Sequence, residues 1–157
     1  MKKTVFIIAA LAAVLVSCEK NDKVDAPIQP KQGEYVGVVT VTYQGADYDN
    51  KDISVDFAPN EKGDSASVTI HQIRFVPQMP VTIDITIPGI AVNSTDDKIA
   101  LKCDSVIPQA MGGEVPRYKV TGLKGEIVDD ELSFSLNFGS YPTSFRGTRI
   151  SSNLQKK

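Results

Sequence analysis

Apolar and polar residues alternate with a period of two over most of this chain from Glu34 onward. In the clearest run, 131–138, every second residue is apolar and those between are mostly Ser or Asn. Successive side chains of a β-strand point to opposite faces, so this pattern predicts half-buried strands. The runs that show it best are 39–43, 52–57, 67–75, 81–87, 98–103, 117–123 and 131–138.

Residues that favour tight turns separate these runs. They are Asn60–Gly63, Pro88–Gly89, 93–97, Gly112–Gly113 and Asp129–Asp130. No window carries a sustained helical stripe of apolar residues free of Pro and Gly, so any helix is expected to be short. About eight amphipathic strands must close on themselves or pack sheet on sheet to hide their apolar faces and edges. We therefore expect an all-β fold, a small antiparallel barrel of about eight strands, with a β-sandwich as the alternative.

The alternation also predicts which side chains point inward. This set is Val41, Tyr43, Val55, Phe57, Ile83, Ile85, Phe134, Leu136 and Phe138. An eight-stranded barrel is either just filled by such side chains or holds one small ligand. If it is hollow, the aromatic residues Tyr43, Phe57, Phe134 and Phe138 are the candidates to bind a small hydrophobic ligand.

A filled barrel would instead act through its surface. Tyr48 and Tyr141 stand near predicted loop ends and are candidates for docking an envelope protein or a glycan. The two functional hypotheses are therefore a ligand-binding barrel and a non-enzymatic interaction module.

The first residues have the pattern of a signal peptide. Lys2 and Lys3 precede an apolar run, 5–16, of 12 residues. As a helix this run spans only ~18 Å, short of the ~30 Å hydrocarbon core of a membrane. We expect residues 1–17 to be a signal peptide that is removed from the mature protein.

The sequence Leu-Val-Ser-Cys at 15–18 resembles the lipobox of bacterial lipoproteins. The resemblance implies that Cys18 becomes a lipidated N-terminus, whose several acyl chains hold the protein stably in a membrane. The alternative is an ordinary secretory signal with an incidental cysteine. We expect a lipid-anchored protein of the cell envelope, in the outer membrane and on either of its faces. Residues 18–33 then form a flexible tether, 34–150 the folded domain and 151–157 a polar tail.

Composition excludes several functions. With 157 residues the chain forms one domain, and its net charge of −2 argues against binding nucleic acid through a basic surface. The chain has a single histidine, His71, and Cys103 is the only cysteine besides Cys18, so we expect no metal site. Nothing in the sequence calls for a cofactor.

The sequence also offers few groups of residues that could form a catalytic site. A dyad of Cys103 and His71 is conceivable, but His71 falls in the polar set of its strand and Cys103 is expected to be a small buried hydrophobe. The paired acids lie in turns, where adjacent side chains diverge. We therefore expect no enzymatic activity. Ser65 and Ser105 follow aspartates and precede apolar residues, which resembles an acceptor pattern for bacterial O-glycosylation.

Three stretches, 33–42, 68–85 and 132–148, together resemble the calycin-like domain of exported bacterial lipoproteins. The likeness covers nearly all of 33–150 and rests mainly on strand-forming residues and glycines. It implies a lipocalin-like eight-stranded barrel and a ligand-binding role, and it lends no catalytic residues.

Overall fold

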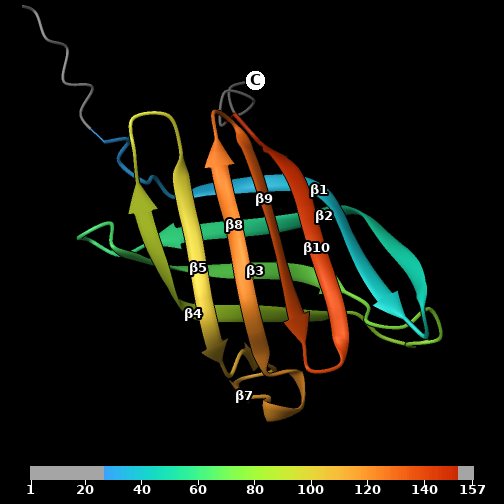
Figure 1. Ribbon diagram of the computed structural model, residues 1–157. Helices are drawn as coiled ribbons and strands as arrows, with labels where there is room; N and C mark the ends of the chain where they lie inside the picture. Colours follow the sequence, from blue (N-terminus) through green and yellow to red (C-terminus); the bar gives the residue numbers. More distant parts are fainter. Residues whose placement is uncertain (1–26, 152–157) are drawn as a thin grey trace, which may run out of the picture.

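The fold is a closed antiparallel β-barrel of eight strands, seen in a computed structural model that describes residues 27–151 (Figure 1). Around the barrel the order is β3, β2, β1, β10, β9, β8, β5 and β4, and pairing of β3 with β4 closes the ring. The barrel strands are β1 (Gly33–Tyr43), β2 (Ala46–Pro59), β3 (Ser65–Ile73), β4 (Ile83–Ser94), β5 (Ile99–Val106), β8 (Val120–Val128), β9 (Glu131–Phe138) and β10 (Tyr141–Arg149). Closure of the ring confirms the predicted barrel over the sandwich.

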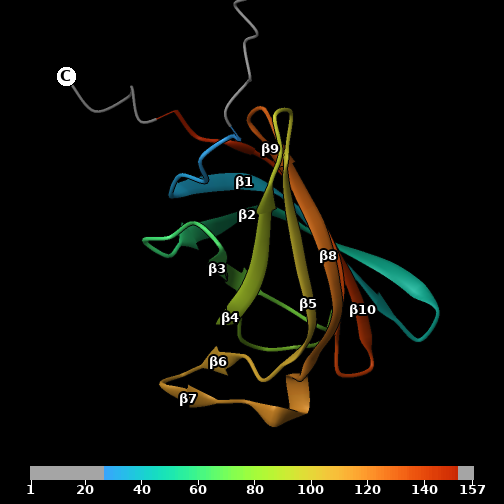
Figure 2. The same cartoon turned by 60° about the vertical axis from the view of Figure 1, so that its left-hand side comes forward.

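The connection from β5 to β8 carries the remaining elements. A two-residue pair, β6 (Gln109–Ala110) and β7 (Gly113–Glu114), forms a small hairpin that joins β4 through the pairing of Gln109 with Thr86. A short 3-10 helix, η1 (Pro116–Tyr118), follows. Figure 2 shows the hairpin and η1 projecting together at one end of the barrel.

The interior of the barrel is a hydrophobic core. Of the nine side chains predicted to point inward, all are buried except Tyr43, which is half-buried. The largest fully buried side chains include Tyr35, Phe57, Phe75 and Phe138. The lumen is thus occupied by the protein's own side chains, which interdigitate across it as in other protein cores.

The turn predicted at Pro88–Gly89 is wrong. β4 continues through both residues and bends there, with Gly89 at a positive φ of 67° that a residue with a Cβ rarely adopts. β4 pairs with β3 from Ile83 to Ala91, on both sides of the bend, and with β5 from Ala91 to Ser94. Val81, predicted to begin this strand, lies outside it and is 60% exposed.

Other bounds also differ from the prediction: β1 and β2 begin earlier, at Gly33 and Ala46. Residues 116–118 form η1 rather than a strand, because Pro116 has no N–H to give to a ladder, and β8 begins at Val120. Phe75 lies beyond the end of β3 yet is buried. The last strand, β10, was not predicted, because only Tyr141 and Phe145 give it an apolar signal between Pro, Ser, Thr and Gly.

The two ends of the barrel differ. At the end where the chain enters and leaves, Arg149 Nη2 donates to the hydroxyl of the fully buried Tyr35 at 2.8 Å, and the guanidinium carbon lies 5.2 Å from the Tyr35 ring centre. These contacts tie β1 to β10. The Ile28 N–H also donates to the Thr95 carbonyl at 3.0 Å, so the last part of the predicted tether, 27–32, lies against this end.

The predicted signal peptide (1–17), Cys18, the predicted tether up to residue 26 and the predicted tail from 152 lie outside the described residues. Within 27–151, no helix is long and apolar enough to cross a membrane.

The opposite end is organised by one buried amide. Asn50 Oδ1 accepts the N–H of Arg74 at 3.0 Å, and Asn50 Nδ2 donates to the carbonyl of the same residue at 3.1 Å. Asn50 thus satisfies both backbone groups of Arg74, where the chain leaves β3, and fixes the loop 74–82 that carries Phe75. We call this pair of hydrogen bonds the Asn50 latch.

Replacing Asn50 with Ala should therefore lower the free energy of unfolding by about 1–3 kcal/mol, because the Arg74 backbone groups lose their partners. Urea denaturation measures this change. Asn93, an exposed asparagine on β4, is the matched control, and Asn93→Ala should shift stability by no more than about 0.5 kcal/mol. Equal stability of the two variants would contradict the role given to the latch.

Candidate functional site

Five aromatic rings meet at the end of the barrel opposite the chain termini. We call this group the aromatic end; it consists of Tyr43, Phe75, Tyr118, Phe138 and Tyr141. Phe75 is its centre: its ring centre lies 4.3 Å from that of Tyr118, 5.2 Å from that of Phe138 and 5.6 Å from that of Tyr141. Tyr43 joins through Tyr141, at 6.2 Å. These separations are typical of stabilising aromatic pairs.

The rings come from separate segments that the topology brings together. Antiparallel connectivity puts the β1–β2 turn, the β3–β4 loop, the β5–β8 connection and the β9–β10 turn at the same end. The Asn50 latch holds the loop that carries Phe75. The Gly139 N–H donates to the Lys119 carbonyl at 2.8 Å, which joins the β9–β10 turn to the residue after Tyr118.

The aromatic end is partly open to solvent. Phe75 and Phe138 are buried, whereas Tyr43, Tyr118 and Tyr141 are half-exposed. Two large apolar side chains in connections at this same end are exposed: Val81, in the β3–β4 loop, at 60%, and Met111, at the tip of the β6–β7 hairpin, at 84%. Exposed apolar and aromatic side chains gathered in one region mark a binding surface more often than a structural need.

The structure brings together only part of the predicted ligand-binding set. Tyr43 and Phe138 belong to the aromatic end, together with Tyr141, which was predicted for surface docking. Phe57 is fully buried on β2 and is not among these rings. Phe134 packs against Phe145, with ring centres 5.3 Å apart. Tyr48 is half-buried on β2.

Sequence reasoning missed Phe75 and Tyr118. Phe75 was counted as the last residue of a strand, and Tyr118 as part of another. The one available signal was Pro116, whose fixed φ and missing N–H favour the first turn of a helix and not a central strand. Arg117 was also missed; its guanidinium carbon lies 5.7 Å from the Tyr118 ring centre and adds positive charge beside the aromatic end.

His71 lies on the outer face of the barrel between two carboxylates. Its Nε2 is 2.9 Å from Asp56 Oδ2 on β2, and its Nδ1 is 3.3 Å from Asp84 Oδ2 on β4. Only the protonated ring can donate to both carboxylates at once. The hydrogen bond with Asp56 is the main reason why the pKa of His71 is raised above its ordinary 6.5, and Asp84 adds to the effect. A hydrogen bond from the Gln72 N–H chiefly lowers the pKa of Asp84.

The geometry does not assemble the other candidate chemistry. Cys103 is buried in the core, where desolvation raises the pKa of its thiol, whereas His71 stands on the outer face, so the two do not form a dyad. Among the residues that the structure describes, no group of three His, Cys, Asp or Glu side chains is placed to hold a metal ion. Of the two predicted glycosylation sites, Ser105 is exposed and Ser65 is half-buried.

Comparisons with known proteins add no identification: no family model, characterised protein or solved structure matches this chain.

The bridge from His71 to Asp56 and Asp84 predicts a pH dependence of stability. The pKa of His71 in the folded protein is above 6.5. The stability that His71 contributes is therefore complete below pH 6.5 and is lost as the pH rises through the pKa of the folded state. Because the folded pKa of Asp84 is below 3.8, its contribution is lost as the pH falls below 3.8.

Urea denaturation of the wild type and of His71→Gln should therefore differ more at pH 5.5 than at pH 8.5. The His71 side chain is 34% exposed, so solvent screening limits the difference to about 1 kcal/mol or less. His71 is the only histidine, so the change near neutral pH is assigned to it. Stability curves that stay parallel from pH 5.5 to 8.5 would contradict this role.

Proposed function

We propose that this protein is a lipid-anchored lipoprotein of the cell envelope that binds a small hydrophobic ligand at the aromatic end of its calycin-like barrel. The observation that carries the proposal is the convergence of five aromatic rings at one end of the barrel, three of which belong to half-buried tyrosines. Exposed apolar side chains stand in two of the connections at the same end. Ligand sites are typically lined by aromatic and apolar side chains with a few polar groups that fix orientation.

Because the lumen is filled, we expect the ligand at the end of the barrel and not in its centre. Fully buried residues such as Phe57 and Ile85 already occupy the interior. Contacts are available from Tyr43, Tyr118 and Tyr141, whose hydroxyls supply polar groups beside the rings. Arg117 is positioned to attract an anionic group on the ligand, such as a carboxylate.

Membrane attachment through Cys18 is compatible with this arrangement. The chain enters the barrel at Gly33, at the end closed by Tyr35 and Arg149, so an N-terminal anchor leads to that end. The connections that meet at the aromatic end, among them the β6–β7 hairpin and the β9–β10 turn, lie at the other extreme of the strands (Figure 2). An anchored barrel would thus keep its ligand site away from the tether.

The apolar fluorophore 1-aminoanthracene tests the ligand site directly. We expect saturable binding to the wild type and displacement by a fatty acid such as decanoate. Tyr118→Ala and Tyr141→Ala should each weaken binding about tenfold, since an aromatic contact contributes about 1 kcal/mol or more.

Tyr48→Ala is the matched control, because Tyr48 is also a half-buried tyrosine but stands apart from the five rings. Its affinity for the fluorophore should equal that of the wild type. Absence of saturable binding, or an equal loss in all three variants, would overturn the proposed site.

The lipid anchor has its own test. When the full chain is produced in a Gram-negative host, mass spectrometry of membrane fractions should find a mature N-terminal peptide that begins at Cys18 and carries acyl chains. Cys18→Ser should abolish acylation, whereas Cys103→Ser should not, because Cys103 is buried in the barrel. An unmodified Cys18 thiol in native membranes would refute the anchor.

A further inference from the structure

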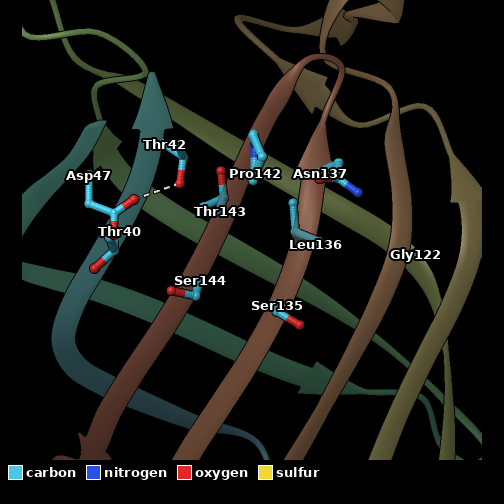
Figure 3. A pocket seen from close by; sticks show the side chains of 10 residues that line it. All are labelled: Thr40, Thr42, Asp47, Gly122, Ser135, Leu136, Asn137, Pro142, Thr143 and Ser144. Carbon is cyan, nitrogen blue, oxygen red and sulfur yellow. Dashed lines mark hydrogen bonds between the residues drawn. The ribbon is translucent and has the colours of Figure 1, made fainter. Parts of the chain in front are cut away.

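The outer wall of the barrel is hollowed where β1, β10, β9 and β8 lie side by side. Figure 3 shows this hollow, of about 300 Å³, whose lining residues are mostly Ser, Thr, Asn and Asp, with Gly, Leu and Pro among them. Its lining includes Thr40 and Thr42 from β1, Ser144 from β10, and Ser135 and Asn137 from β9. Asp47 is the only charged residue in the lining.

A second hollow, of about 510 Å³, continues the first along the same wall. The two share Ser135 and Ser144, so they form one trough. Beyond the shared serines the trough is bordered by Lys124, Glu126 and Arg146. We call the joined hollows the outer trough.

The sheet register explains why the outer trough exists. Ser135 pairs with Ser144 across β9 and β10, Ser144 pairs with Thr40 on β1, and Ser135 pairs with Lys124 on β8. Small hydroxyl side chains thus stand next to one another at the strand spacing of about 4.8 Å, and larger side chains stand on either side. The centre of this face is low because its residues are small.

A β-bulge lies on one side of the trough. The register of β8 and β9 shifts between Thr121 and Lys124, so that Gly122 and Leu123 face a single residue, Leu136. Gly122 has a positive φ of 63°, and it lines the hollow. Bulges leave backbone groups outside the ladder and are frequent beside binding sites, which gives the trough a second feature besides its shape.

We propose that the outer trough is a second binding site, and that it takes a neutral carbohydrate. A hydroxyl both donates and accepts hydrogen bonds, as sugar hydroxyls do, and Asn137 adds both an amide donor and an acceptor. The carboxylates at the β1–β2 side are already engaged: Thr42 Oγ1 donates to Asp47 and Thr40 Oγ1 donates to Asp49, each at 2.7 Å. Each keeps acceptor capacity for a sugar hydroxyl.

The charge pattern distinguishes a carbohydrate from other occupants. The first hollow has no cationic lining residue to hold a phosphate or a carboxylate. Lys124 and Arg146 line the second hollow, where Arg146 is 3.5 Å from Glu131. Protein interfaces are poor in serine at their centres and rich in aromatic residues, the reverse of this surface. A neutral, hydroxyl-rich ligand matches what the trough offers.

Calorimetric titration of the detergent-solubilised full chain tests the proposal with four neutral pentasaccharides, built of α-glucose, β-glucose, mannose and xylose. At least one should bind. Ser144→Arg and Ser135→Arg should each weaken that binding at least tenfold, because a long charged side chain fills the trough. Both positions are exposed on outward-facing strand residues, so the fold should survive the change.

Ser67→Arg is the matched control, since Ser67 faces outward on β3, away from the trough, and its affinity should equal that of the wild type. Tyr118→Ala should also leave carbohydrate binding unchanged, which separates the outer trough from the aromatic end. The proposal is overturned if none of the four sugars binds, if Ser144→Arg binds as well as Ser67→Arg, or if Tyr118→Ala abolishes binding.

Discussion

The pairing of β3 with β4 is the constraint on which the rest of the structure depends. Without it, eight strands would form an open sheet with two long edges and one exposed apolar face. The pairing includes residues of β4 on both sides of the bend at Gly89, and from Ala91 onward β4 also pairs with β5. It is also reinforced from outside, where His71 on β3 bridges to Asp56 on β2 and Asp84 on β4. Closure then brings the apolar faces of all eight strands onto one core.

A filled core changes how a barrel of this size can act. Because side chains occupy the lumen, a ligand would have to bind at the end of the barrel or on its outer wall. The two proposed sites follow from this. The aromatic end uses rings from strand ends and from the connections to which Phe75 and Tyr118 belong, and the outer trough uses small polar residues that face outward from the strands. Successive residues of one strand, such as Tyr141 and Pro142, therefore serve different sites.

The alternation of apolar and polar residues was enough to predict the fold class and most of the core. In β9 the predicted and observed bounds coincide, because every second residue is strongly apolar and Asp129–Asp130 forms a turn before it. In β10 the same alternation is hidden, because inward positions such as Thr143 and Gly147 are small or polar. The inward residues of β10 are buried because β1 and β9 pair with it on either side, and the sequence of β10 alone cannot show this.

The sequence by itself determined the class of fold and the inward face of most strands, because these depend on residue type and on spacing within one strand. It also determined that the domain holds no second cysteine that could form a disulfide with Cys103. Only the tertiary structure decided that the lumen is filled, that Phe75 and Tyr118 stack, and that Ser135 and Ser144 meet in one trough. These features join segments that are far apart in the chain, such as Asn50 and Arg74. The physical cause is the register of the strands and the closure of the barrel, which bring these segments together. The residues of both proposed sites are therefore neighbours in space and not in sequence.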